Sequence, residues 1–67
     1  MSTYRLEFEM MTGEFESIES NNFDEIESHF NEIIKNKDCT EAIITEFFIY
    51  GGICQGEKVL KNYKKDD

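Results

Sequence analysis

Residues 22–35, which read NFDEIESHFNEIIK, decide the fold class, because they predict a helix between segments that predict strands. Asn22 is a favoured N-cap residue, and Glu25 follows it three positions later, as in a capping box. Asn36 is expected to end the helix in the left-handed conformation. The pattern therefore predicts one amphipathic helix over residues 23–35. Its apolar stripe consists of Phe23, Ile26, Phe30, Ile33 and Ile34.

Four segments on either side of this helix predict strands. Residues 4–11 alternate between apolar and polar side chains, and residues 14–19 form a second strand after a turn at Gly13. Residues 40–50 are rich in β-branched and aromatic side chains and predict a long central strand. Residues 57–63 return as the last strand after a glycine turn. The order β-β-α-β-β predicts an α+β fold, in which one helix packs on one face of a small antiparallel sheet.

One domain accounts for the whole pattern, because 67 residues are close to the lower limit for a domain with its own core. We assign residues 1–63 to this single α+β domain and residues 64–67 to a polar C-terminal tail. The apolar stripe of the helix is expected to pack against one set of strand residues. These are Leu6, Phe8, Met10, Ile43, Phe47, Ile49 and Leu60.

The formal net charge of −8 comes entirely from the first half of the chain. Residues 1–34 carry nine acidic residues and one arginine, whereas residues 35–67 carry six acidic residues and six lysines. This excess argues against direct binding of nucleic acid or of an anionic membrane, because phosphate contacts require lysine and arginine. It favours a protein partner with a basic surface, and a merely solvated acidic surface is the simpler alternative.

An acidic face built from the first hairpin and the helix is the main candidate for partner binding. Its residues are Glu7, Glu9, Glu14, Glu16, Glu19, Asp24, Glu25 and Glu27. In size, charge and expected architecture the chain is similar in type to small acidic anti-defence proteins of phages and other mobile elements. By this analogy we expect a DNA-mimicking inhibitor, of the anti-CRISPR or anti-restriction kind, that blocks the basic surface of a nucleic-acid-handling host enzyme.

Two alternatives to the inhibitor stay open. The first is a homo-oligomer that binds a small anionic ligand, such as a signalling nucleotide, through residues 51–56 and through Lys58 or Lys61. The second is a dimeric adaptor with an apolar interface on the sheet face opposite the helix. The candidate interface residues are Ile44, Phe48 and Tyr50.

No pattern in the sequence predicts catalysis, a metal site or a cofactor. Cys39 and Cys54 do not form a CxxC pair, and His29 is the only histidine, so the ligands of a structural zinc site are missing. No base is expected beside Cys54 that would make it a nucleophile. Residues 1–10 contain three charged side chains instead of the apolar core of a signal peptide, so we expect a cytoplasmic protein, in the host cell if a phage encodes it.

Overall fold

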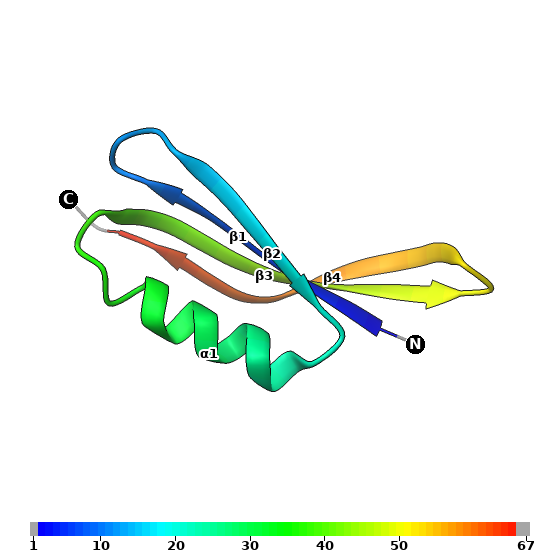
Figure 1. The fold of residues 1–67 in the computed structure, drawn as a ribbon. Coiled ribbons are helices and arrows are strands. Elements are labelled where there is room, and N and C mark those ends of the chain that lie inside the picture. The colour runs from blue at the N-terminus through cyan, green and yellow to red at the C-terminus, as the bar shows by residue number, and fades with distance from the viewer. Residues whose placement is uncertain (1, 66–67) are drawn as a thin grey trace.

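A computed structural model describes residues 2–65, which form a four-stranded antiparallel sheet with one helix packed on one face (Figure 1). The elements are β1 (Ser2–Met10), β2 (Phe15–Ser20), α1 (Phe23–Ile33), β3 (Cys39–Tyr50) and β4 (Ile53–Lys64). Their order across the sheet is β2-β1-β3-β4, so that β1 and β3 are the central strands. The predicted fold class, α+β with a small antiparallel sheet and one helix, is confirmed.

The helix α1 begins where its capping pattern predicts. Asn22 is the N-cap, and its side-chain oxygen accepts a hydrogen bond from the backbone N–H of Glu25 at 3.3 Å. The helix ends at Ile33, two residues before the expected end, and Asn36 does not adopt the left-handed conformation. The Asn36 side chain instead accepts a hydrogen bond from the backbone N–H of Asp38 at 2.9 Å. This local turn replaces the last helical residues and leads the chain into β3.

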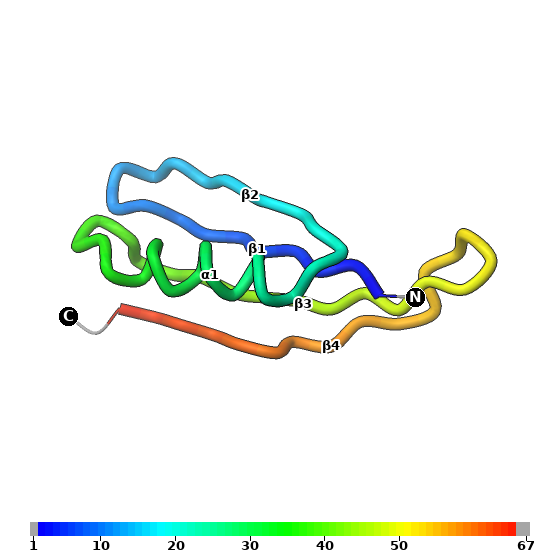
Figure 2. Tube along the Cα trace, turned by 60° about the horizontal axis from the view of Figure 1, so that its bottom comes forward, coloured from blue at the N-terminus to red at the C-terminus, as the bar shows by residue number. Residues whose placement is uncertain are grey.

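The β3–β4 hairpin is longer than the sequence pattern predicts. Gly51 and Gly52 have φ angles of 59° and 77°, and positive φ at both central positions is what a two-residue type I′ turn requires. Strand β4 therefore starts at Ile53, which pairs with Tyr50, four residues before the expected start. Residues 49–54 lie beyond the last residue pair between β1 and β3. The hairpin tip consequently projects past α1 and past the start of β1 (Figures 1 and 2).

The core lies between α1 and the sheet face that carries Leu6 and Ile44. Its buried residues are Leu6, Phe8, Ile26, Phe30, Cys39, Ala42 and Ile44. Met10 and Leu60 pack against this cluster, as expected.

The prediction that Ile43, Phe47 and Ile49 pack beneath the helix is wrong, because none of the three belongs to the core cluster. Pairing of β1 with β3 places Leu6 opposite Ile44, so Ala42, Ile44 and Glu46 share the covered face. Both alternating sets in this strand contain large apolar residues, and a shift of one residue moves every side chain to the other face.

The end of the described chain is more ordered than a free tail. Lys64, which we assigned to the tail, is the last residue of β4. The backbone N–H of Lys65 donates a hydrogen bond to the carbonyl oxygen of Thr40 at 2.9 Å. Asp66 and Asp67, the last two residues of the predicted tail, lie outside the described residues.

Candidate partner-binding face

The sheet face opposite α1, called the open face below, is not covered by any other element of residues 2–65 (Figure 1). Residues directly opposite each other in antiparallel strands project to the same face, so the register fixes its composition. Read across β2, β1, β3 and β4, three successive rows are Phe15, Glu9, Glu41 and Lys64, then Ser17, Glu7, Ile43 and Asn62, then Glu19, Arg5, Thr45 and Val59.

A hollow of about 320 Å³ lies on this face. Its lining residues are Glu7, Phe8, Glu9, Phe15, Glu41, Ile43, Thr45 and Val59. Phe15 and Val59 leave 63% and 57% of their surface exposed, whereas Thr45 is only 7% exposed. The hollow therefore combines exposed apolar side chains, carboxylates and one deeply placed hydroxyl group.

The carboxylates of Glu7, Glu9 and Glu41 have no ionic partner among the described residues. Glu9 and Glu41 are directly opposite each other in β1 and β3, an arrangement of like charges that destabilises a sheet. Lys64 is paired with Glu41 in the sheet register, but the two side chains form no ion pair within 4.0 Å. These three carboxylates are therefore free to meet a cationic group of a partner.

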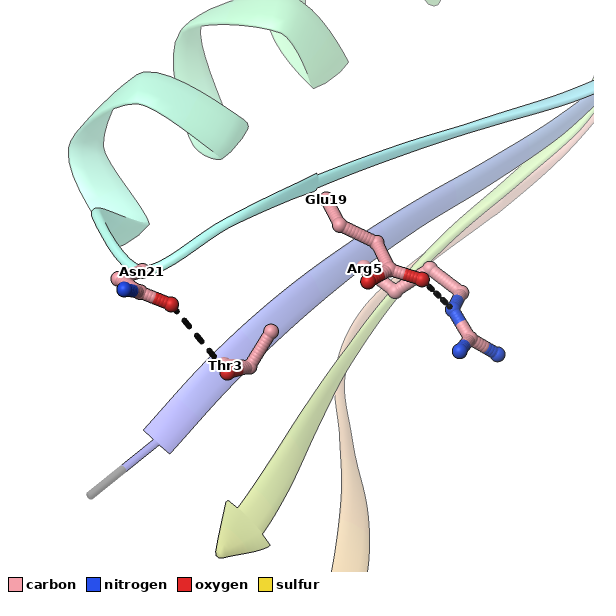
Figure 3. A network of polar contacts seen from close by, with 4 residues as sticks. All are labelled: Thr3, Arg5, Glu19 and Asn21. Atoms are coloured by element: carbon pink, nitrogen blue, oxygen red, sulfur yellow. Dashed lines mark hydrogen bonds and ion pairs between the residues drawn. The ribbon is translucent and has the colours of Figure 1, made fainter. Parts of the chain in front are cut away.

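A second part of the open face is already occupied by the protein's own cation (Figure 3). The Nε of Arg5 donates a hydrogen bond to Oε1 of Glu19 at 3.1 Å, and its guanidinium carbon lies 4.6 Å from the centre of the Phe47 ring. Beside it, the Thr3 hydroxyl donates to Oδ1 of Asn21 at 3.3 Å. This part of the face thus holds an arginine between a carboxylate and an aromatic ring.

The structure divides the eight predicted acidic residues among several places. Glu7, Glu9 and Glu19 lie on the open face, and Glu14 lies in the turn between β1 and β2. Glu16 is opposite Phe8, which puts it on the helix side of the edge strand.

Three further residues of that set, Asp24, Glu25 and Glu27, belong to α1. Glu27 is neutralised there by Lys61, whose Nζ lies 2.8 Å from its Oε2. The structure therefore brings together Glu7 and Glu9, adds Glu41 to them, and places the helix acids on the other side of the molecule.

Sequence reasoning missed Glu41, Phe15 and Thr45 as members of this face. Glu41 lies in residues 35–67, which are neutral overall, so counting the charges of each half of the chain does not single it out. Phe15 and Ile18 differ in parity along β2, and continuous pairing with β1 puts Phe15 on the open face and Ile18 toward the helix. That mismatch in parity was the available signal for Phe15.

The assignment of Ile44 to an exposed interface is wrong. Ile44 is fully buried in the core, because it lies opposite Leu6 beneath α1. Phe48 and Tyr50, the other two candidates, are 38% and 71% exposed near the tip of the β3–β4 hairpin. Their role in an interface stays a prediction.

The groups that could support catalysis or metal binding lie apart. Cys39 is a free thiol in the core, and its burial raises the pKa of that thiol. Cys54 is a free, exposed thiol beside the hairpin tip, whereas His29 lies on α1. Within residues 2–65, no group of three histidine, cysteine, aspartate or glutamate residues is placed to hold a metal ion.

Comparison of the chain with protein-family models, with curated proteins and with solved structures found no match. None of the described residues belongs to a helix long and apolar enough to cross a membrane.

Proposed function

We propose that this chain is a non-catalytic binding protein whose open face covers a basic surface of a partner protein. One observation carries the proposal. Three carboxylates without ionic partners, those of Glu7, Glu9 and Glu41, adjoin the exposed apolar residues Phe15 and Val59. Apolar side chains exclude water at the centre of an interface, and charges around them select the partner and accelerate its association.

The partner class follows from the chemistry of the carboxylates and from the net charge of −8. Proteins that bind nucleic acids present clustered lysine and arginine to the phosphates, so an acidic sheet face competes for the same groups. The proposed activity is therefore inhibition of a nucleic-acid-handling enzyme by occlusion, in the manner of an anti-defence protein acting in the cytoplasm. This activity needs no reaction and no cofactor in the chain itself.

The test compares two triple variants that have the same net charge. Glu7→Gln, Glu9→Gln and Glu41→Gln together remove the carboxylates of the open face. Glu16→Gln, Glu32→Gln and Glu46→Gln together remove three carboxylates elsewhere, since Glu16 and Glu46 lie opposite Phe8 and Tyr4 on the helix side and Glu32 is on α1. Each protein is used to capture partners from a host-cell lysate at low and at high salt, and the captured enzyme is then assayed for nucleic-acid binding.

The proposal expects a captured enzyme that is lost with the open-face variant, retained with the helix-side variant and released by salt. Binding of nucleic acid by the enzyme should also decrease as increasing amounts of the chain are added. Equal loss of enzyme capture with both triple variants would mean that capture depends on the net charge of the chain and not on the open face. An enzyme that binds the chain and nucleic acid together would contradict inhibition by occlusion.

A homodimer is a second candidate, favoured by the composition of the hairpin tip. Residues 47–56 contain no charged side chain, although one third of the chain is charged. Phe48, Tyr50 and Ile53 are exposed there, and two copies of an acidic protein repel each other least at an uncharged surface. Replacing Phe48 and Tyr50 by serine should then give a soluble monomer in analytical ultracentrifugation, and an unchanged oligomer would remove this candidate.

The anion-binding alternative gains no such support. Lys61 is paired with Glu27, and Lys58 lies opposite Glu46 in the sheet. Residues 51 and 52 form a two-residue hairpin turn instead of an open loop.

A further inference from the structure

We propose that the hollow on the open face is an anchor site for one arginine side chain of the partner protein. The inference rests on the proposed function and names the group that this face recognises. Its volume of about 320 Å³ is near the lower limit of roughly 300 Å³ for ligand pockets, which suits a single extended side chain.

The chemistry of the lining matches the two parts of an arginine. The aliphatic stem can lie against Val59 and Ile43, while the guanidinium group reaches the carboxylates of Glu9 and Glu41. A guanidinium group donates two parallel hydrogen bonds to a carboxylate and stacks on an aromatic ring, and Phe15 lies beside Glu9 in the adjacent strand. A lysine ammonium provides neither the paired donors nor the flat surface for stacking.

Thr45 gives a second, independent indication of a ligand. Its residue surface is 93% buried, yet its hydroxyl group forms no hydrogen bond with any described residue. In that part of the chain, every buried side-chain nitrogen or oxygen that is shut off from solvent has a partner. The hydroxyl oxygen must therefore keep an opening to solvent, and the hollow that Thr45 lines provides it. A guanidinium N–H bound in the hollow would donate to this oxygen in place of solvent.

The same face already holds one arginine in such surroundings. The Nε of Arg5 lies 3.1 Å from the Glu19 carboxylate (Figure 3), and its guanidinium carbon lies 4.6 Å from the centre of the Phe47 ring. The hollow repeats this combination of carboxylate and aromatic ring without a cation, because Glu7, Glu9 and Glu41 lack ionic partners. A metal ion is a poorer fit, since the described carboxylates do not converge into a group of three.

The test is an NMR titration of the isotope-labelled chain with N-acetyl-arginine amide. Citrulline amide, which has the same shape without the charge, and lysine amide serve as matched ligands, both N-acetylated. We expect backbone amide shifts concentrated at Phe15, Glu9, Glu41 and Thr45, with affinity about tenfold weaker for both matched ligands, because each lacks the charged fork of donors. Equal affinity for the lysine or citrulline compound, or stronger shifts with Mg²⁺, would overturn the assignment to arginine.

Two pairs of variants connect those shifts to the hollow. Glu9→Gln with Glu41→Gln should weaken arginine binding about tenfold, whereas Glu16→Gln with Glu46→Gln should leave it unchanged. Phe15→Ala should weaken it, whereas Met11→Ala, which removes a side chain of similar exposure (61% against 63%) outside the hollow, should not. Shifts spread over the acids of α1, or equal effects within either pair, would overturn the proposal.

The titration and the enzyme capture together separate this proposal from the proposed function, and the substitution Thr45→Val tests the anchor site without changing any charge. If enzyme capture depends on Glu7, Glu9 and Glu41 but arginine amide does not bind, the anchor is wrong and the binding face stands. If arginine amide binds in the hollow but no enzyme is captured through this face, the proposed function fails instead. Weaker arginine binding by Thr45→Val, with unchanged thermal stability, is the result that the anchor site expects.

Discussion

The two faces of the sheet are made from alternating residues of the same strands, yet one is stabilised by apolar packing and the other carries carboxylates without counter-charges. On the covered face Leu6 and Ile44 are fully buried against α1. On the open face Glu9 and Glu41 lie opposite each other with no cation to offset them. A feature that lowers stability without compensation inside the fold indicates a role outside it. The covered face thus supplies the stability that offsets the repulsion between the carboxylates on the open face.

Replacing Ile44 and Ile43 separately by alanine should give the largest contrast between the two faces. Ile44→Ala empties a site in the core and should lower the free energy of unfolding by about 2–5 kcal/mol. That is a large part of the roughly 3–10 kcal/mol expected for a chain of this length. Ile43→Ala removes a half-buried side chain from the open face and should have an effect of roughly 1 kcal/mol. Urea unfolding measures both, and equal losses would contradict the assignment of the faces.

This pair of isoleucines also marks the limit of prediction for the fold. The helix, the four strands and their order follow from the spacing of apolar residues, because local periodicity reports local structure. The facing of β3 does not follow, because both alternating sets of residues 42–50 contain large apolar side chains. Facing is decided by the partner strand, and only the register of Leu6 with Ile44 reveals it.

The proposed binding face was less accessible to prediction than the fold. Its carboxylates come from β1 and β3, and Glu9 and Glu41 are 32 positions apart along the chain. Charge counts along the sequence do not bring these two residues together. The acids of α1 were grouped with those of β1 because both lie in the first half of the chain. Once the helix packs on the covered side, the two groups are separated by the sheet.

The covered face depends on α1, so weakening the start of the helix should reduce stability by an intermediate amount. Asn22→Ala removes the oxygen that accepts the Glu25 N–H and should lower stability by about 1 kcal/mol. In a domain of this size, that loss corresponds to a fall in melting temperature of roughly 4–8 °C. Asn31→Ala, inside the same helix and exposed, is the matched control and should not lower the melting temperature. A comparable fall with the control would mean that the cap does not stabilise the helix.

Reducing the negative charge of the open face should raise stability, in contrast to the substitutions that weaken the covered face. Glu9→Gln removes the repulsion with Glu41 and should raise stability by roughly 0.2–1 kcal/mol. Added salt should stabilise the unaltered chain more than this variant, because salt screens the same repulsion. Glu16→Gln, which changes a carboxylate opposite Phe8, is the control for net charge. A loss of stability with Glu9→Gln would show that its carboxylate has a partner in the fold.

The smallest expected effects are those of the two ion pairs, one on each face. Double-mutant cycles with Glu27→Gln and Lys61→Met, and with Glu19→Gln and Arg5→Met, should each give a coupling of about 0.2–1 kcal/mol, as partly exposed pairs do. The Glu27–Lys61 coupling should be the larger, because the Glu27 side chain is 34% exposed against 55% for Glu19. The Lys61 ammonium also lies 5.7 Å from the centre of the Phe30 ring. Couplings of similar, small size on both faces would mean that ion pairs do not distinguish them, and that the difference lies in the carboxylates that have no pair.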